Sequence, residues 1–429
     1  MKRKIHPSHL SGSVGIPGSK SHTIRGLLLA AWSDGTSRLY SPLESSDTAS
    51  CRSAVRALGA QVRARLDHRE TVGPRGLIRQ PAETIDVGNS GTTLYLTAGM
   101  CAASESPVRF DGDEQIRRRS AANLLNALRD LCAQVKCHGR EGYVPFTIHG
   151  PLRGGSSRIE CPTSQYLSAL LLSAPLASPD REETVIRVPL LYERPYVDMT
   201  LDWLDRQHIR YRRRGYEEFT VATGQRYLPF EARIPGDFSS ATFFAAAAAV
   251  TGSALELRGL DLNDSQGDKE AFEILSRMGC TVLQLGEALR VEGPEGGRLS
   301  GGEFDLNNIP DALPALAVAG CFAGGEVLLG NVPQARQKET DRIAVMHQEL
   351  SRLGAVLEER EDGLLIRSGS FSRESFGAGD VEVSGHGDHR VIMALAVAGL
   401  ASAAPVTIDE TGPAAVTFPE FFHLLSELG

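Results

Sequence analysis

Long hydrophobic runs, paired cysteine motifs and an excess of positive charge are all missing from this sequence of 429 residues. Its longest apolar stretches, 243–250 and 26–32, are far shorter than the ~20 residues that a membrane-spanning helix needs. The seven cysteines include no Cys-X-X-Cys pair, which indicates reduced thiols and argues against a disulfide framework or a zinc site. A net charge of −8 argues against a general nucleic-acid-binding protein. We therefore expect a cytoplasmic enzyme that binds neither nucleic acid nor membrane.

Lysine is also scarce, since only six of the 45 basic residues are lysines. The basic start 1–4 is followed by polar residues and no apolar segment, so we expect no signal peptide. Two of the lysines, Lys20 and Lys338, lie beside glycine or acidic residues in short polar motifs. The remaining basic residues are arginines, which bind carboxylates and phosphates through a planar fork of donors. This composition favours small anions as ligands.

What the sequence does contain is a repeat of about 73 residues. Short polar or glycine-bearing turns precede apolar, mostly alanine-rich runs at six places, and their markers are separated by 73, 73, 73, 74 and 77 residues: Gly18, Gly91, Ser164, Asp237, Asp311 and Asp388. A second set of six helix-end patterns, from Leu58-Gly59 to Leu428-Gly429, keeps nearly the same period. Two independent landmarks with one period indicate six copies of one supersecondary unit.

Each copy predicts a mixed α/β unit. A polar N-cap begins a helix of small apolar residues, as in 239–250, and a strand such as 326–329 follows. An amphipathic helix comes next, as in 341–353, with Ile343, Met346, Leu350 and Leu353 on one face. Short strands such as 355–358 and 363–367 complete the unit. Because the alanine-rich helices are apolar all round, we expect them inside the sheets.

The first and fourth copies share a Pro-Gly pair, at Pro17-Gly18 and at Pro235-Gly236. Three copies per domain is the natural grouping, with the chain crossing between domains at these two pairs. We therefore predict one discontinuous domain, 1–18 plus 236–429, and one continuous domain, 19–235.

The starts of the repeated helices are candidate anion sites. The first turn of a helix offers unpaired N–H groups and a partial positive charge to a phosphate or carboxylate. Ordinary caps look the same in sequence. Basic groups at equivalent places in several copies favour a functional site: Lys20 and Arg25, Arg117 to Arg119, Lys338 and Arg342, and Arg390. We expect a locally positive site despite the negative net charge.

Six motifs, in this order along the chain, carry a resemblance to a known family: 17–25 (PGSKSHTIR), 88–92 (GNSGT), 164–170 (SQYLSAL), 310–312 (PDA), 338–342 (KETDR) and 388–390 (DHR). Together they resemble 5-enolpyruvylshikimate-3-phosphate synthases over essentially the whole chain. The resemblance implies an enolpyruvyl-transferase fold with six βαβαββ repeats, three in each domain, arranged as inside-out α/β barrels. It also implies an active site in the interdomain cleft, closed by domain movement.

The reaction implied by the resemblance transfers the enolpyruvyl group of phosphoenolpyruvate to the 5-hydroxyl of shikimate 3-phosphate by addition and elimination, without metal or cofactor. The catalytic set implied is Asp311, Lys338, Glu339 and Lys20. Its chemistry needs a base near the attacking hydroxyl and an acid near the enolpyruvyl methylene. The residues leave open which group serves as the acid. Asp311 could also be a helix N-cap after Pro310.

The resemblance assigns substrate contacts as well. Lys20, Ser21 and Arg25 resemble ligands of the cyclohexene substrate, and Thr163, Ser164 and Gln165 resemble two phosphate-binding hydroxyls and an amide between both substrates. Gly91 and Arg119 are similar to the phosphate side of the phosphoenolpyruvate site, and Arg342 and Arg390 to its carboxylate clamp. Four more residues complete the implied binding set: Asn89, Arg194, Tyr196 and His389. We expect a monomer with small anionic substrates as its partners.

Several positions depart from the family pattern. Tyr95 stands where an arginine is usual, Glu193 where a serine commonly helps to hold the shikimate phosphate, and Val416 where one branch has a lysine. Ser120 and His386 replace a proline and a tyrosine. A carboxylate beside a phosphate in a partly desolvated site costs on the order of 1 kcal/mol or more. The phosphate contacts near positions 95 and 193 are therefore the least secure part of the assignment.

These departures leave alternative functions open. One is a diverged relative that acts as a lyase on an unphosphorylated enolpyruvyl substrate, such as chorismate dehydrated to 3-enolpyruvyl-benzoate. A sister enzyme acting on UDP-N-acetylglucosamine would carry a reactive cysteine in the loop 112–120, which contains none. A non-catalytic binder is the remaining alternative, and it would have no use for the proton-transfer groups. The transferase is the leading hypothesis.

Overall fold

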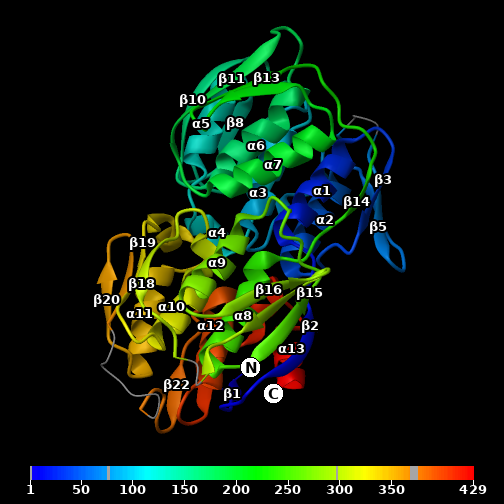
Figure 1. The fold of residues 1–429 in the computed structure, drawn as a ribbon. Helices are drawn as coiled ribbons and strands as arrows, with labels where there is room; N and C mark the ends of the chain where they lie inside the picture. Colours follow the sequence, from blue (N-terminus) through cyan, green and yellow to red (C-terminus); the bar gives the residue numbers. More distant parts are fainter. Residues whose placement is uncertain (1, 75–77, 296–297, 368–374) are drawn as a thin grey trace. The chain divides into compact units, whose positions relative to one another are not determined.

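The computed structural model describes residues 2–74, 78–295, 298–367 and 375–429. The chain divides into two compact units: unit 1 comprises Met1–Pro17 and Pro235–Gly429, and unit 2 comprises Gly18–Ile234. The limits drawn from the sequence, 18 and 236, differ from these by one residue at each crossing. Each unit contains helices and mixed sheets, as the repeat predicts (Figure 1).

Unit 2 contains three sheets of four strands, in the orders β14-β3-β5-β4, β6-β7-β9-β8 and β10-β11-β13-β12. In each sheet one parallel pair continues into antiparallel strands. The strands are β3 (Thr36–Tyr40), β4 (Gln61–Ala64), β5 (His68–Val72), β6 (Ile85–Asp86), β7 (Val108–Asp111), β8 (Gln134–Cys137), β9 (Phe146–His149), β10 (Gly155–Cys161), β11 (Glu183–Leu191), β12 (Tyr211–Arg214), β13 (Glu218–Ala222) and β14 (Glu231–Arg233). The helices are α1 (Lys20–Trp32), α2 (Ser46–Ala57), α3 (Gly91–Cys101), α4 (Glu114–Arg118), α5 (Ala122–Asp130), α6 (Ser164–Ser173) and α7 (Arg194–Arg206).

Unit 1 has sheets in the orders β16-β17-β15-β2, β18-β19-β21-β20 and β1-β23-β22. Its strands are β1 (Arg3–Ile5), β2 (Ser11–Gly15), β15 (Ala254–Arg258), β16 (Thr281–Leu285), β17 (Ala288–Glu292), β18 (Gly302–Asp305), β19 (Val327–Gly330), β20 (Leu357–Arg360), β21 (Gly363–Ile366), β22 (Val381–Val383) and β23 (Val406–Ile408). The helices are α8 (Phe238–Thr251), α9 (Glu270–Arg277), α10 (Leu313–Cys321), α11 (Arg342–Arg352), α12 (His389–Leu400) and α13 (Phe421–Leu428).

The alanine-rich helices form the core of each unit. In unit 1, α8, α10 and α12 pack against one another, and Ala245 to Ala249 of α8 are fully buried. In unit 2, α3 packs against both α1 and α6. A helix with small apolar side chains on every face has no side suited to water, so it lies inside the sheets. This confirms the placement predicted from composition.

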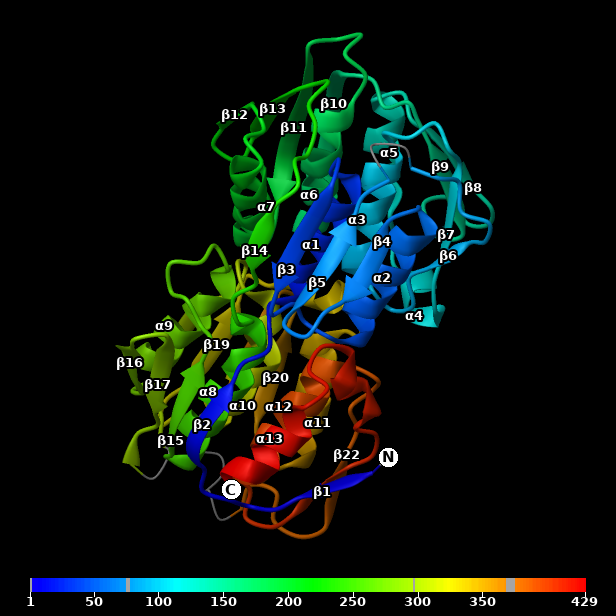
Figure 2. The ribbon, with the colours of Figure 1, turned by 90° about the vertical axis from the view of Figure 1, so that its right-hand side faces the viewer.

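The first strands of two repeats are exchanged where the chain crosses between units. Strand β2 pairs in parallel with β15 of unit 1, whereas β14 pairs in parallel with β3 of unit 2 (Figure 2). The glycines of the two Pro-Gly pairs at the crossings are tightly enclosed. A Cβ at Gly18 would lie 2.2 Å from the carbonyl oxygen of Ser41, and one at Gly236 would lie 2.7 Å from that of Gly259. Both positions therefore require glycine.

Local predictions agree with the structure to within a few residues. The helix expected over 239–250 is α8, and the amphipathic helix expected over 341–353 is α11, with Ile343, Met346, Leu350 and Leu353 all buried. The strand expected over 326–329 is β19, and those expected over 355–358 and 363–367 are β20 and β21. Within the described residues, no helix is both long enough and apolar enough to cross a bilayer.

Candidate active site

Unit 1 gathers six charged residues that come from three segments of the chain. Asp311 lies in the short helix η4 (Pro310–Ala312), Lys338, Glu339 and Arg342 lie at and before the start of α11, and Asp388 and Arg390 lie at the start of α12. Asp311 and Asp388 mark equivalent places in the fifth and sixth copies, and 338–342 precedes the second helix of the fifth copy, so three helix starts bring the motifs together. We call the set Asp311, Lys338, Glu339, Arg342, Asp388 and Arg390 the arginine–carboxylate cluster.

Arg342 is the centre of this cluster. Its side chain is 1% exposed, and the guanidinium donates from Nε to Asp388 over 2.8 Å, from Nη1 to Asp311 over 2.7 Å and from Nη2 to Glu339 over 2.6 Å. Burial alone would lower the pKa of Arg342, but the three carboxylates raise it above its ordinary value. The planar guanidinium satisfies several carboxylates at fixed angles, which a lysine ammonium would not.

Asp311 also contacts the other two cations of the cluster. Arg390 Nη2 lies 3.0 Å from Asp311 Oδ2, and Lys338 Nζ lies 3.8 Å from Asp311 Oδ1. The side chains of Asp311 and Lys338 are 17% and 16% exposed, so solvent reaches both. The sequence alternative that Asp311 is a helix N-cap is wrong: it lies inside η4, and its carboxylate accepts from Arg342. A neighbouring acid and ammonium in partial contact with solvent are suited to proton transfer.

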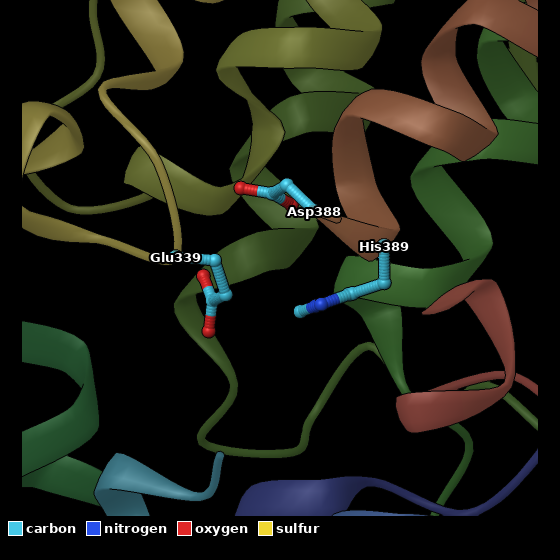
Figure 3. A group of neighbouring side chains, drawn as sticks. All are labelled: Glu339, Asp388 and His389. Atoms are coloured by element: carbon cyan, nitrogen blue, oxygen red, sulfur yellow. The ribbon is translucent and has the colours of Figure 1, made fainter. Parts of the chain in front are cut away.

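Glu339, Asp388 and His389 lie together at the same place, and their donor atoms are all within 4.8 Å of one another (Figure 3). Three such donors resemble a metal site in composition. Here the carboxylates of Glu339 and Asp388 already accept from the buried guanidinium of Arg342. A divalent ion would add a second buried cation beside that guanidinium, so the group is better described as part of the ion-pair network.

In unit 2, Lys20 is the first residue of α1 and forms an ion pair with Asp47 near the start of α2. Its Nζ is 3.1 Å from Asp47 Oδ2, and the two side chains are 15% and 8% exposed. Sequence analysis did not single out Asp47. The signal available for it was the Ser45-X-X-Thr48 capping box of α2, which predicts a helix start but not an ion pair with Lys20.

Arg25 is buried within unit 2. Its Nε donates to the Thr200 hydroxyl over 2.9 Å, and its Nη2 donates to the Ser168 hydroxyl and the Tyr196 carbonyl. Nη1 donates to the carbonyl of Ser21 over 3.1 Å. Burial lowers the pKa of Arg25 to about 10. Predicted binding residues 21, 25 and 196 are therefore brought together, with Arg25 joining α1 to α6 and α7.

The carboxylate of Glu193, the residue before α7, is bound at the start of α6. Glu193 Oε2 accepts hydrogen bonds from the Ser164 hydroxyl over 2.8 Å, the Ser164 N–H over 3.1 Å and the Thr163 hydroxyl over 3.2 Å. The Thr163 hydroxyl also caps α6 by accepting from the Gln165 N–H. Two predicted ligands, Thr163 and Ser164, thus contact Glu193, one of the residues that depart from the family pattern.

The starts of α3 and α6 approach each other through Gly91. A Cβ at Gly91 would lie 3.2 Å from Arg119 Nη1 and 3.6 Å from Gln165 Oε1. The Arg119 Nη2 donates to the Asn89 side chain over 3.2 Å. Gly91, Asn89, Arg119 and Gln165 therefore share one neighbourhood, and the missing Cβ leaves space beside the guanidinium.

The structure also places the other residues that depart from the family pattern and the predicted ligand Arg194. Tyr95 donates to the Ser120 carbonyl over 3.1 Å, and Tyr166 donates to the same oxygen. His386 Nε2 lies 2.9 Å from the buried Glu349 carboxylate. The Arg194 guanidinium lies over the Tyr216 ring, 5.2 Å from the ring centroid. Val416 ends the short helix η6 (Gly412–Val416).

Comparison with known proteins shows the family to which this chain belongs. The model of the EPSP synthase (3-phosphoshikimate 1-carboxyvinyltransferase) family matches residues 5–425. The chain is 46% identical over 429 residues to a 3-phosphoshikimate 1-carboxyvinyltransferase of Acetivibrio thermocellus, covering 100% of this chain and 98% of that protein. A protein of the same name from Methanocella arvoryzae is 39% identical and covers 100% and 99%.

Solved structures of similar fold include an EPSP synthase of Acinetobacter baumannii. It superposes with a TM-score of 0.82 at 27% identity, covering 100% of this chain and 98% of that one. The likeness covers both units of the chain. The chain belongs to the EPSP synthase (3-phosphoshikimate 1-carboxyvinyltransferase) family.

Proposed function

We propose that this protein transfers the carboxyvinyl (enolpyruvyl) group of phosphoenolpyruvate to the 5-hydroxyl of shikimate 3-phosphate, a step of the shikimate pathway. The observation that carries the proposal is the arginine–carboxylate cluster, found in a chain whose full length matches this transferase family. Nothing in the comparisons favours the chorismate lyase alternative.

The reaction balances without a redox partner. The acceptor oxygen forms a bond to C2 of phosphoenolpyruvate as the methylene carbon gains a proton, and the acceptor hydroxyl loses one. The resulting methyl group then loses a proton as the C2–O bond to phosphate breaks, which restores the C=CH2 double bond and releases inorganic phosphate. The step therefore requires groups that donate and accept protons at two neighbouring positions.

Residues of unit 1 supply the proposed proton transfer and carboxylate binding. Lys338 and Asp311 are adjacent and partly exposed, and Glu339 accepts a hydrogen bond from Nη2 of Arg342. Arg342 and Arg390 both contact Asp311, so their positive charges lie beside the proton-transfer pair. A substrate carboxylate would then be held by guanidinium groups whose orientation the network has already fixed.

Residues of unit 2 supply the proposed contacts to the acceptor and to the phosphate that leaves. Lys20 begins α1, the Arg25 network joins α1 to α6 and α7, and Thr163 and Ser164 offer hydroxyls for the acceptor phosphate. Gly91 and Arg119 provide a space beside a guanidinium, as a phosphoryl group requires. The proposal assigns both sets of residues to a single reaction.

A phosphate-release assay tests the function. The purified chain should release inorganic phosphate only when shikimate 3-phosphate and phosphoenolpyruvate are both present, and it should leave chorismate unchanged. Lys338→Met should lower kcat by about 100-fold or more, because it removes a proton-transfer group. Lys136→Met, at an exposed position of β8, is the matched control and should retain activity. Chorismate consumption without phosphate release would reject the transferase in favour of the lyase.

A further inference from the structure

The first turn of α6 is built to bind an anion. It presents the hydroxyls of Thr163 and Ser164 together with the Ser164 N–H, all directed to one point. A helix N-terminus adds partial positive charge to such a point, and phosphates and carboxylates both bind there. In this chain the point is occupied by an oxygen of the protein itself, Glu193 Oε2.

Glu193 is placed at this point by the backbone. The residue adopts the left-handed conformation, with φ +59° and ψ +44°, immediately before the first turn of α7. A non-glycine residue in this region is strained, and such strain persists only where the surroundings hold it. The side chain is also buried, since Glu193 is 2% exposed. The carboxylate is therefore an ordered internal ligand of α6.

One set of donors cannot serve two anions at once. A phosphate that used the Thr163 and Ser164 hydroxyls would have to occupy the position of the Glu193 carboxylate, and the two negative groups would repel each other. An acceptor that lacks the phosphate would leave the carboxylate in place. Glu193 is thus positioned to discriminate between acceptors according to whether they carry a phosphate.

We propose that Glu193 is a specificity-determining residue: its carboxylate is an intramolecular ligand of the anion site at Thr163 and Ser164, and a phosphorylated acceptor must displace it in order to bind. The inference rests on the proposed function, because that function supplies a phosphorylated acceptor. It predicts that the chain binds shikimate 3-phosphate less tightly than the donors at α6 would allow, while Glu193 has little effect on unphosphorylated shikimate.

Calorimetric titration of the full chain with shikimate 3-phosphate and with shikimate tests this inference. Glu193→Ser removes the carboxylate, and Glu193→Gln removes its charge while keeping its size. We expect both variants to lower the Kd for shikimate 3-phosphate at least tenfold and to leave the Kd for shikimate within twofold. Glu182→Ser, at an exposed acidic position in the same unit, is the matched control and should change neither Kd.

A purely structural role for Glu193 predicts a different result. The variants would then melt at lower temperature, and the ratio of the two dissociation constants would stay within twofold of that of the unmodified chain. That result, or absence of shikimate 3-phosphate binding in both variants, would overturn the inference.

The two proposals fail in different ways, because the titration needs no turnover. If the proposed function is wrong, phosphoenolpyruvate with shikimate 3-phosphate releases no phosphate from any variant, yet the ratio of dissociation constants still reports on Glu193. If only the inference is wrong, the unmodified chain releases phosphate and the ratio does not move.

Discussion

Arg342 shows how this protein keeps charged groups buried beside the proposed proton-transfer pair. Its guanidinium is surrounded by the carboxylates of Asp311, Glu339 and Asp388, and the cluster contains three cations and three anions. Removing one member of such a network leaves a buried charge without its partner, which is costlier than the pair is stabilising. The network therefore fixes the positions of Lys338 and Asp311 without excess charge.

The ionisation of Asp388 makes the stability of this network depend on pH. Burial alone would raise the pKa of Asp388, but the Arg342 cation beside it lowers that pKa below its ordinary value. The folded-state pKa is thus lower than the unfolded value of about 3.9, so this carboxylate stabilises the fold fully above about pH 5. The stabilisation is lost as the pH falls through the folded-state pKa.

Asp388→Asn tests this statement by urea unfolding. We expect the variant to lose about 3–5 kcal/mol of unfolding free energy at pH 7, since Arg342 then lacks one partner. The difference from the unmodified chain should shrink as the pH is lowered from 5 towards 3. A difference that stays constant over this range would show that the charge of Asp388 does not provide the stabilisation.

At the scale of single residues, the sequence indicates which groups could be reactive but not their partners. Lys20, Lys338 and Arg342 stand out because they lie in short motifs at helix starts. The ion pair of Lys20 with Asp47 and the contact of Glu193 with Ser164 join residues 27 and 29 positions apart. No local spacing encodes such contacts, because they depend on how the two helices within one repeat pack, α1 with α2 and α6 with α7.

Helix packing in the core of unit 2 depends on close approach at one glycine. Gly99 lies within α3 where this helix meets α6, and a Cβ there would lie 2.8 Å from the carbonyl oxygen of Ala169 and 2.9 Å from its Cβ. Both neighbours are fixed atoms of a helix, so neither can move aside without shifting the backbone. The contact limits position 99 to glycine.

Gly99→Ala should destabilise unit 2 by about 1–3 kcal/mol, the usual cost of overpacking a core. Gly139→Ala is the matched control, because nothing lies within 4 Å of a Cβ at that position. Surface substitutions of this kind usually stay within about 0.5 kcal/mol. Urea unfolding of the two variants measures the difference, and equal stabilities would contradict the packing described for α3 and α6.

At the scale of elements, the periodic apolar runs predict the positions of the core helices better than the candidate N-cap residues do. The apolar runs locate the core helices to within a residue or two, because a helix without a polar face has only one kind of environment. Side-chain caps occur at Ser90, Thr163, Asp237 and Asp388 but not at Ser19 or Asp311. At Asp311 the competing interaction is the ion pair with Arg342, which residue type alone does not reveal.

The whole molecule is organised by a single exchange of strands. The repeat predicts six copies of one unit of structure. With β2 paired to β15 and β14 paired to β3, three copies belong to each compact unit. The sequence indicates this exchange through the recurring Pro-Gly pair, whose glycines are sterically required. The central claim is that this chain transfers the carboxyvinyl group of phosphoenolpyruvate to shikimate 3-phosphate, as its family membership indicates.

The most direct test of that claim is product analysis by 31P and 1H NMR. The purified chain is incubated with equimolar phosphoenolpyruvate and shikimate 3-phosphate. We predict loss of phosphoenolpyruvate with equal amounts of inorganic phosphate and of a new enolpyruvyl ether on the acceptor. Phosphate without the ether would indicate simple hydrolysis, and unchanged substrates would show no transfer, so either result would contradict the account.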